Sequence, residues 1–243
     1  MDAALYIPVV TTCVAAAFAT VVLKRYRVRR VQHLAWWGAG IILFGAGTFL
    51  EGATTLIGWN EWLFRSWYVA GALLGGAPLA QGTVYLHFGK RFANASAAVL
   101  MAVVTVAATL VFLSPVDASL ADEHRLSGEV LVWSWVRAFS PFVNTYAFIF
   151  LVGGAIVSAM HYRRREGARD AFAGNVLIAV GAVLPGIGGT FTRFGHVEVL
   201  YVTEFIGICL IWAGYWLNVR GQDPGLTTPA GKPIRQRERA RVS

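Results

Sequence analysis

Residues 34–89 read LAWWGAGIILFGAGTFLEGATTLIGWNEWLFRSWYVAGALLGGAPLAQGTVYLHFG. This stretch holds two apolar runs, 34–57 and 63–86, separated by a short polar turn. Because about 20 apolar residues span the hydrocarbon core of a bilayer, the stretch predicts a hairpin of two transmembrane helices. Glu51 falls inside the first run and Arg65 near the start of the second. Unpaired charge is costly in hydrocarbon, so both residues are candidates for function.

Similar apolar runs precede and follow the hairpin. Of all residues in the chain, 56% are hydrophobic and only 14% are charged, whereas a soluble domain carries about 25% charged residues. These features predict an all-α, polytopic membrane protein in which residues 1–220 form one transmembrane domain of seven helices. The seven predicted helices are 3–23, 34–57, 63–86, 93–114, 138–160, 171–192 and 197–218.

The distribution of basic residues sets the predicted orientation, since Lys and Arg are retained on the cytoplasmic side of a membrane. With the N-terminus outside, all but four of the 21 Lys and Arg residues lie in the inner connections or in the C-terminal tail. The sequence therefore predicts an N-out, C-in multi-pass protein of a cytoplasmic membrane, and the high content of Ala, Gly and Arg suggests a bacterial one. The four basic residues on the outer side are Arg65, Arg125, Arg137 and Arg193.

The net charge of +8 does not indicate a nucleic-acid partner. The positive charge is concentrated on one predicted membrane face, where anionic lipid headgroups account for it. Residues 221–243, rich in Pro, Gly and Arg, predict a disordered basic cytoplasmic tail. The expected partners are the lipid bilayer and the anionic headgroups of its inner face. A homo-oligomer, or an intracellular partner bound to the tail, is left open.

A weak internal repeat relates the two halves of the chain. At an offset of 137 residues, Gly58 aligns with Gly195 and Glu61 with Glu198. The matched segments run in the same direction across the membrane, as in a parallel repeat. The sequence thus predicts a 3+1+3 architecture. Its parts are repeat 1 at about 3–89, a linker helix at 93–114 and repeat 2 at about 138–218.

The 3+1+3 arrangement resembles the architecture of the sugar-carrier and PQ-loop families and, more distantly, that of the opsins. The resemblance concerns topology and identifies no family. The chain contains no Pro-Gln dipeptide, so the PQ-loop motif is absent. Lys24, Lys90 and Lys232 all lie outside the predicted helices, so no lysine can carry a retinal Schiff base as in an opsin.

The candidate site residues share a predicted depth in the outer half of the membrane. At 1.5 Å per residue, Glu51 and Glu204 each lie about 13 Å below the nearest outer turn. Each acid either pairs with an arginine to fix helix register or belongs to a ligand or proton site. In such a site an arginine binds an anionic group and a desolvated glutamate carries a proton. The predicted site comprises Glu51, Glu204, Arg65, Arg137, Arg193, Gln81, Asn144, Tyr146 and Tyr201.

Two of the predicted helices contain proline beside several glycines. Pro78 follows Gly75 and Gly76 in the third helix, and Pro185 precedes Gly186 in the sixth. Proline removes a backbone donor and obstructs the preceding turn, so we expect both helices to be bent or locally open. Such interruptions either line a cavity or simply bend a helix.

A metal site is a weaker alternative. His33, His87 and His161 lie near predicted inner helix ends, where three imidazoles at one depth could hold a metal ion. The chain has no phosphate-binding Gly-Lys loop, Cys-x-x-Cys, His-Glu-x-x-His or Gly-x-Ser-x-Gly motif. Enzymatic activity is therefore not favoured, and no cofactor is expected.

Three functional hypotheses follow from these patterns. The leading one is a carrier-like bundle that binds a small solute, anionic or amphipathic, between the two repeats and couples its movement to a proton on Glu51 or Glu204. The second is a ligand-binding sensor or accessory membrane subunit without transport. The third is a membrane-embedded metal hydrolase. The sequence does not identify the ligand.

Overall fold

The computed structural model describes residues 6–122 and 126–222. Within these residues the protein is all-α and has seven helices long and apolar enough to span a membrane, as predicted. The basic tail at 223–243 and the first residues of the predicted first helix lie outside the described residues. The helices are α1 (Ile7–Arg29), α2 (Gln32–Ile57), α3 (Glu61–Trp67), α4 (Ala77–His87), α5 (Lys90–Leu113), α6 (Phe139–Ala147), α7 (Gly153–Arg163), α8 (Arg169–Phe191) and α9 (Val197–Gln222).

Two of the seven spans are composite. In the third, α3 continues into the π-helical segment η2 (Tyr68–Leu73), and α4 follows after a short non-helical break. In the fifth, the π-helical segment η6 (Phe148–Val152) joins α6 to α7 without a break. π-Helical segments are rare and occur frequently at functional sites, so the interior of these two spans is the first place to look for one.

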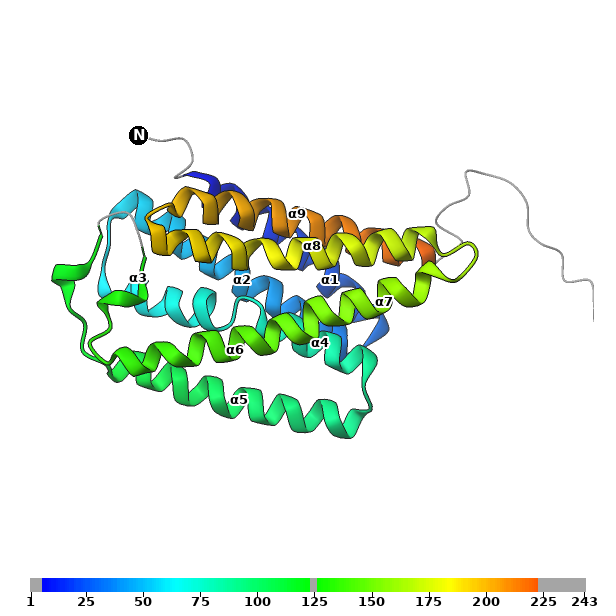
Figure 1. Ribbon diagram of the computed structural model, residues 1–243, viewed down its shortest axis with the longest axis horizontal. Coiled ribbons are helices and arrows are strands. Elements are labelled where there is room, and N and C mark those ends of the chain that lie inside the picture. The colour runs from blue at the N-terminus through cyan, green and yellow to red at the C-terminus, as the bar shows by residue number, and fades with distance from the viewer. Residues whose placement is uncertain (1–5, 123–125, 223–243) are drawn as a thin grey trace, which may run out of the picture.

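The helices form one bundle in which neighbours in sequence pack side by side (Figure 1). The longest contact surface joins α8 to α9, and α2 packs against both α1 and α4. Contacts between α1 and α9 bring the first and last spans together. The predicted linker helix, α5, lies at the opposite edge of the bundle from α8 and α9 (Figure 1). The first span therefore contacts both the second and the seventh span.

The break in the third span lies where the sequence predicts it. Leu74, Gly75 and Gly76 are not helical, and Pro78 occupies the first turn of α4. Proline is favoured in the first turn because it lacks an N–H that would have no helical partner there. The sixth span does not open locally, because α8 remains helical through Pro185, and the expected bend of that helix stays a prediction.

Two glycines of α8 allow close packing against α9. Gly174 and Gly181 are seven residues apart, and they face Gly214 and Gly207 of α9. A Cβ atom on Gly181 would lie 2.6 Å from the carbonyl oxygen of Gly207, and one on Gly214 would lie 2.4 Å from that of Gly174. Small residues let membrane helices approach this closely. This glycine seam fixes the position of α9 against α8.

Basic connections gather at one end of the bundle. The α4–α5 and α7–α8 turns and the C-terminal end of α9 lie together there (Figure 1). The α1–α2 turn carries the basic residues that end α1, which extends to Arg29, six residues beyond its predicted end. Basic side chains are favourable in the last turn of a helix. The N-out, C-in orientation and the 3+1+3 repeat remain predictions, although the aligned glycines Gly58 and Gly195 both adopt positive φ, 82° and 90°.

Candidate functional site

Glu51 lies on the buried face of α2 with 4% of its surface exposed. Small residues on the same helix allow this burial. A Cβ atom on Gly47, one turn before Glu51, would lie 2.9 Å from the Cα atom of Gly71 in η2. One on Gly52 would lie 3.1 Å from a methyl group of Val9 on α1. The glycines therefore place Glu51 where α1, α2 and η2 approach one another closely.

Trp67 orients the Glu51 side chain. Its indole Nε1–H donates a hydrogen bond of 2.8 Å to Oε1 of Glu51. The site predicted from the sequence does not include Trp67. A usable signal was present, since Glu51 and Trp67 each lie eight residues from Trp59 in the hairpin turn. Residues equidistant from the turn of a helical hairpin lie at the same depth.

Glu204 of α9 completes an acid pair with Glu51. The two carboxyl groups lie side by side, close enough for one to donate a hydrogen bond to the other. The Oε2 atoms of both are buried, and neither has any other hydrogen-bond partner within residues 6–122 and 126–222. Buried polar atoms are nearly always hydrogen-bonded, so two unsatisfied carboxyl oxygens at one point need an explanation.

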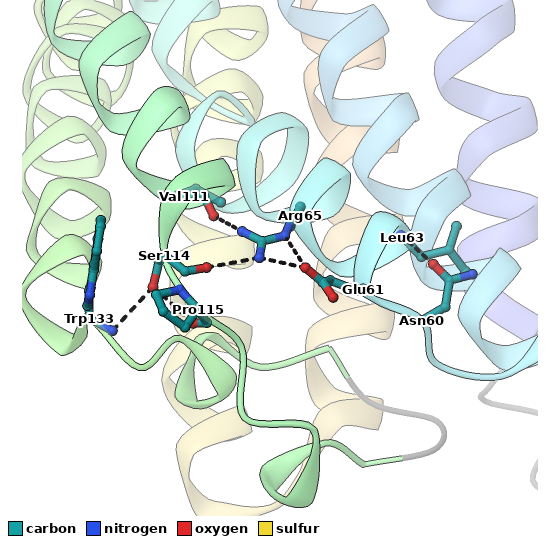
Figure 2. A network of polar contacts seen from close by, with 8 residues as sticks. All are labelled: Asn60, Glu61, Leu63, Arg65, Val111, Ser114, Pro115 and Trp133. Carbon is teal, nitrogen blue, oxygen red and sulfur yellow. Dashed lines mark hydrogen bonds and ion pairs between the residues drawn. The ribbon is translucent and has the colours of Figure 1, made fainter.

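Arg65 is directed away from the acid pair, although the sequence places both in the outer half of the membrane. Its Nε and Nη2 atoms lie 2.9 and 2.6 Å from Oε1 of Glu61, one turn earlier on α3 (Figure 2). Its guanidinium group also donates to the carbonyl oxygens of Val111 and Ser114, the latter at 2.9 Å. These carbonyls belong to the C-terminal end of α5, where cations are favourable. Arg65 thus fastens the third span to α5.

The other predicted charged neighbours are placed differently. Arg137 donates to the carbonyl oxygen of Ser134 at 3.4 Å and lies near Tyr68. Arg193 lies in the short 3₁₀ turn Thr192–Phe194, and its side chain is outside the described structure. Tyr201 is buried on α9, three residues before Glu204. Among the described arginine side chains, neither Arg65 nor Arg137 forms a salt bridge with the acid pair.

Gln81 and Tyr146 form a separate polar network. The Tyr146 hydroxyl donates to Oε1 of Gln81, and Nε2 of Gln81 donates to the carbonyl oxygen of Ala93 at 2.9 Å. Ser96 also contacts the Gln81 amide. Every polar atom of Gln81 has a partner, although the residue is fully buried. This network joins α4, α5 and α6, which is a structural role.

Asn144 compensates for the irregular backbone of the third span. Its Nδ2 atom donates to the carbonyl oxygen of Ala72 at 3.1 Å, and Ser140 donates to the same oxygen at 2.7 Å. Ala72 lies in η2, directly before the helix break. Irregular backbone at membrane depth requires such partners. Two α6 side chains therefore support the break, and Asn144 does not contact the acid pair.

The three histidines do not form a metal site. His87 shares a 3.1 Å hydrogen bond with Ser158 of α7, His33 packs edge-on against Trp37, and His161 packs against Tyr162. No group of three His, Cys, Asp or Glu residues that could hold a metal ion occurs in the described part of the chain. The acid pair is consequently the strongest candidate for a functional site.

Comparisons with known proteins found no match, whether with protein-family models, curated proteins or solved structures.

Proposed function

We propose that the chain is a proton-coupled carrier of a small solute in which Glu51 and Glu204 hold the coupling proton. The observation that carries the proposal is the acid pair: two carboxyl groups from the second and seventh spans meet in a buried place, and each keeps an oxygen without a donor. An acid–base pair or an apolar contact would hold α2 against α9 better. Ionisable residues inside membrane helices commonly mark proton relays and solute pathways.

The shared proton gives the pair two states. With one proton present, one carboxyl group donates a hydrogen bond to the other, as in acid pairs of known enzymes. Loss of the proton leaves two negative charges close together in a place of low dielectric constant, where they repel strongly. This repulsion acts between α2 and α9. It favours either separation of the two helices or entry of a positively charged group between them.

Trp67 and the third span supply the moving part of the proposed mechanism. The indole N–H occupies Oε1 of Glu51 and leaves Oε2 for the shared proton. Trp67 immediately precedes η2, and the non-helical break follows at residues 74–76. Movement of α3 and η2 about this break would shift the Trp67 donor relative to Glu51. Such a movement would link the protonation state of Glu51 to the access of a solute from one side of the membrane.

The surroundings of the pair favour a cationic or neutral amphipathic solute over an anionic one. The expected anion-binding role of Arg65 is not available, because its guanidinium group is bonded to Glu61 and to the end of α5. The pair itself offers carboxyl oxygens beside the indole ring of Trp67. Carboxylates and aromatic rings both attract cations.

Reconstitution tests the proposal directly. The full chain is placed in liposomes that contain a pH-sensitive dye, and a panel of small cationic, neutral and anionic solutes is added. We expect a cationic or neutral solute to change the internal pH, and we expect Glu51→Gln and Glu204→Gln each to abolish the change. Glu198→Gln is the matched control, because Glu198 lies on α9 like Glu204 but is exposed. Full activity of Glu51→Gln would refute the assignment.

Infrared spectroscopy tests the proton site without a solute. A protonated carboxyl group has a C=O stretch distinct from that of a carboxylate. We expect the wild-type protein to show this band at neutral pH. We expect the band to shift in Glu51→Gln and in Glu204→Gln, because the remaining carboxyl group then has an amide and not a second carboxyl group as its partner, and to be unchanged in Glu198→Gln. Absence of the band from the wild-type protein would contradict a shared proton.

A further inference from the structure

A cavity of about 530 Å³ lies at the turn between α7 and α8. This turn is at the end of the bundle where the basic connections gather (Figure 1). α7 ends at Arg163 and α8 begins at Arg169, so the cavity lies at the ends of the fifth and sixth spans. Pockets that bind small molecules commonly measure about 300–1,000 Å³. The cavity is therefore large enough for a lipid headgroup or a small organic molecule.

The backbone of the turn gives the cavity its shape. The amide of Arg165 donates to the carbonyl oxygen of Tyr162 at 3.1 Å, and the amide of Ala168 donates to the carbonyl oxygen of Arg165 at 3.3 Å. Gly167 adopts a φ of 78°, which glycine reaches without the steric cost that a Cβ atom brings. The chain thus reverses between the two helices and arranges side chains from both around one space.

Four of the side chains that line the cavity are arginines: Arg163, Arg164, Arg165 and Arg169. All four are exposed. Within the described part of the chain, their guanidinium groups form no hydrogen bond or ion pair, not even with Glu166, which also lines the cavity. Four guanidinium groups around one space repel one another, so the cavity favours an anion.

The start of α8 adds partial positive charge at the same place. The first N–H groups of a helix have no intrahelical partner and form the positive end of its dipole. α8 is 23 residues long, and no side chain caps its N-terminus. Its first residue, Arg169, lines the cavity, whereas Asp170 in the first turn does not. The helix end therefore attracts an anion to the same place as the arginines.

The other lining side chains favour a phosphate group attached to an organic molecule. Phosphate oxygens point in several directions, so several arginine forks can bind them at once. Tyr162 and Phe172 contribute half-buried aromatic rings to the same cavity. Aromatic rings offer apolar surface, which an inorganic ion does not use. The lining therefore combines donors for a phosphate with a surface for an organic group.

We propose that this cavity binds a phosphate group that belongs to an organic molecule. The phosphate is held by Arg163, Arg164, Arg165 and Arg169. The molecule is either an anionic phospholipid, whose headgroup lies at the membrane surface, or a soluble phosphate ester. The proposal specifies a defined site, beyond a general attraction of the inner face for anionic headgroups. The site is separate from the acid pair, and it stands whether or not the chain is a carrier.

Native mass spectrometry of the full chain in detergent tests the site. Phosphatidylglycerol is titrated into the wild-type protein and into each variant. We expect its affinity to fall about fivefold in Arg165→Gln and in Arg169→Gln, because each variant loses charge-assisted hydrogen bonds to the phosphate. Arg91→Gln is the control, with an expected change below about twofold. It makes the same charge change at an exposed position in the first turn of α5, at the same end of the bundle (Figure 1).

Arg165→Lys separates a defined site from a general attraction of positive charge. Lysine keeps the charge but lacks the planar fork, so we expect the affinity for phosphatidylglycerol to fall about threefold. A general attraction would leave the affinity of Arg165→Lys equal to that of the wild-type protein. It would also make Arg91→Gln bind as weakly as Arg165→Gln. Either result would overturn the proposal.

Glycerol 3-phosphate distinguishes the two sources of phosphate, because it is a soluble phosphate ester without acyl chains. If it displaces phosphatidylglycerol, the site accepts soluble phosphate esters. If it does not, and binding of the lipid still depends on Arg165 and Arg169, the site requires a phospholipid. If lipid binding does not depend on these arginines and glycerol 3-phosphate does not bind, the proposal is wrong.

Thermal unfolding of Arg165→Gln provides an independent readout. In lipid-free detergent the variant should have the same Tm as the wild-type protein, because the guanidinium group has no partner within the described residues. Phosphatidylglycerol should then raise the Tm of the wild-type protein more than that of the variant. A lower Tm of the variant without lipid would show that Arg165 already stabilises the fold, which would refute its role as a free phosphate ligand.

Discussion

Arg65 and Glu51 are buried ionisable residues of the same hairpin, but they differ in how fully their side chains are hydrogen-bonded. Arg65 is 7% exposed, and its Nε, Nη1 and Nη2 atoms all donate to acceptors on α3 and α5. Glu51 is 4% exposed, and only one of its oxygens receives a hydrogen bond from a donor on a neighbouring span. Its other neighbour is a second acid.

This difference indicates that the hydrogen bonds of Arg65 stabilise the fold, whereas the burial of Glu51 destabilises it. Satisfied buried polar groups rigidify a structure, whereas unsatisfied ones destabilise it. Residues retained at a cost in stability are commonly those that a protein needs for activity. Neutral substitutions of Arg65 and of Glu51 should therefore change the free energy of unfolding in opposite directions.

Neutralising Arg65 should cause the largest loss of stability. In Arg65→Met the apolar stem is retained, but the carbonyl groups of Val111 and Ser114 lose their donor. We expect a loss of about 3 kcal/mol in the free energy of unfolding, because hydrogen bonds from a charged donor to buried acceptors are lost. Thermal unfolding in detergent measures the loss, and Arg91→Met, at an exposed arginine, is the control. If the variant is as stable as the wild-type protein, the hydrogen bonds of Arg65 do not stabilise the fold and this prediction is wrong.

The second prediction concerns the glycine seam that positions Glu204. Gly181→Ala should destabilise the protein by about 2 kcal/mol, because the new Cβ atom would lie 2.6 Å from the backbone oxygen of Gly207. Gly186→Ala, on the same helix, is the matched control: nothing lies within 4 Å of its Cβ position. The control should leave the Tm unchanged or raise it. Equal effects of the two substitutions would show that α8 and α9 do not depend on the seam.

Replacing Glu51 by a neutral residue should raise the free energy of unfolding, whereas replacing Arg65 should lower it. In Glu51→Gln the amide oxygen still accepts from Trp67, and the amide nitrogen can donate to Glu204. We expect the free energy of unfolding to rise by about 1 kcal/mol while proton-coupled activity is lost. Glu198→Gln, at an exposed position on α9, should change neither. If Glu51→Gln lowers the Tm, the acid pair is a structural element and the comparison with Arg65 fails.

The sequence predicts the spans well because length and apolar composition are local properties. It also places Glu51 and Glu204 at equal depth, and they do meet, since residues at one depth in a small bundle are few. The partners of Arg65 are harder to predict. Its contact with Glu61 follows the spacing of one helical turn, but the carbonyl groups of Val111 and Ser114 are backbone atoms and have no sequence signature.

Pro185 shows why a proline need not open a helix in a packed bundle. Proline in a helix interior leaves the carbonyl group four residues earlier, that of Gly181, without its N–H partner. In this protein that oxygen lies against Gly207 of α9, where close Cα–H contacts are favourable. The helix remains continuous because its neighbour lies near enough. That proximity depends on glycines 26 residues apart in the sequence, which no local pattern reveals.

The smallest predicted effect concerns the carbonyl group of Ala72, an acceptor that the helix break exposes and that the protein satisfies twice. Asn144→Ala or Ser140→Ala alone should cost about 0.5 kcal/mol, because the remaining donor still bonds the oxygen. The double variant should cost about 2 kcal/mol, more than the sum of the single effects, because the carbonyl group then has no side-chain donor. A double-mutant cycle of unfolding free energies measures this coupling. Additive effects would mean that the break needs no support from α6. The break would then be a further place, besides the acid pair, where the described part of the bundle tolerates an acceptor without a side-chain donor.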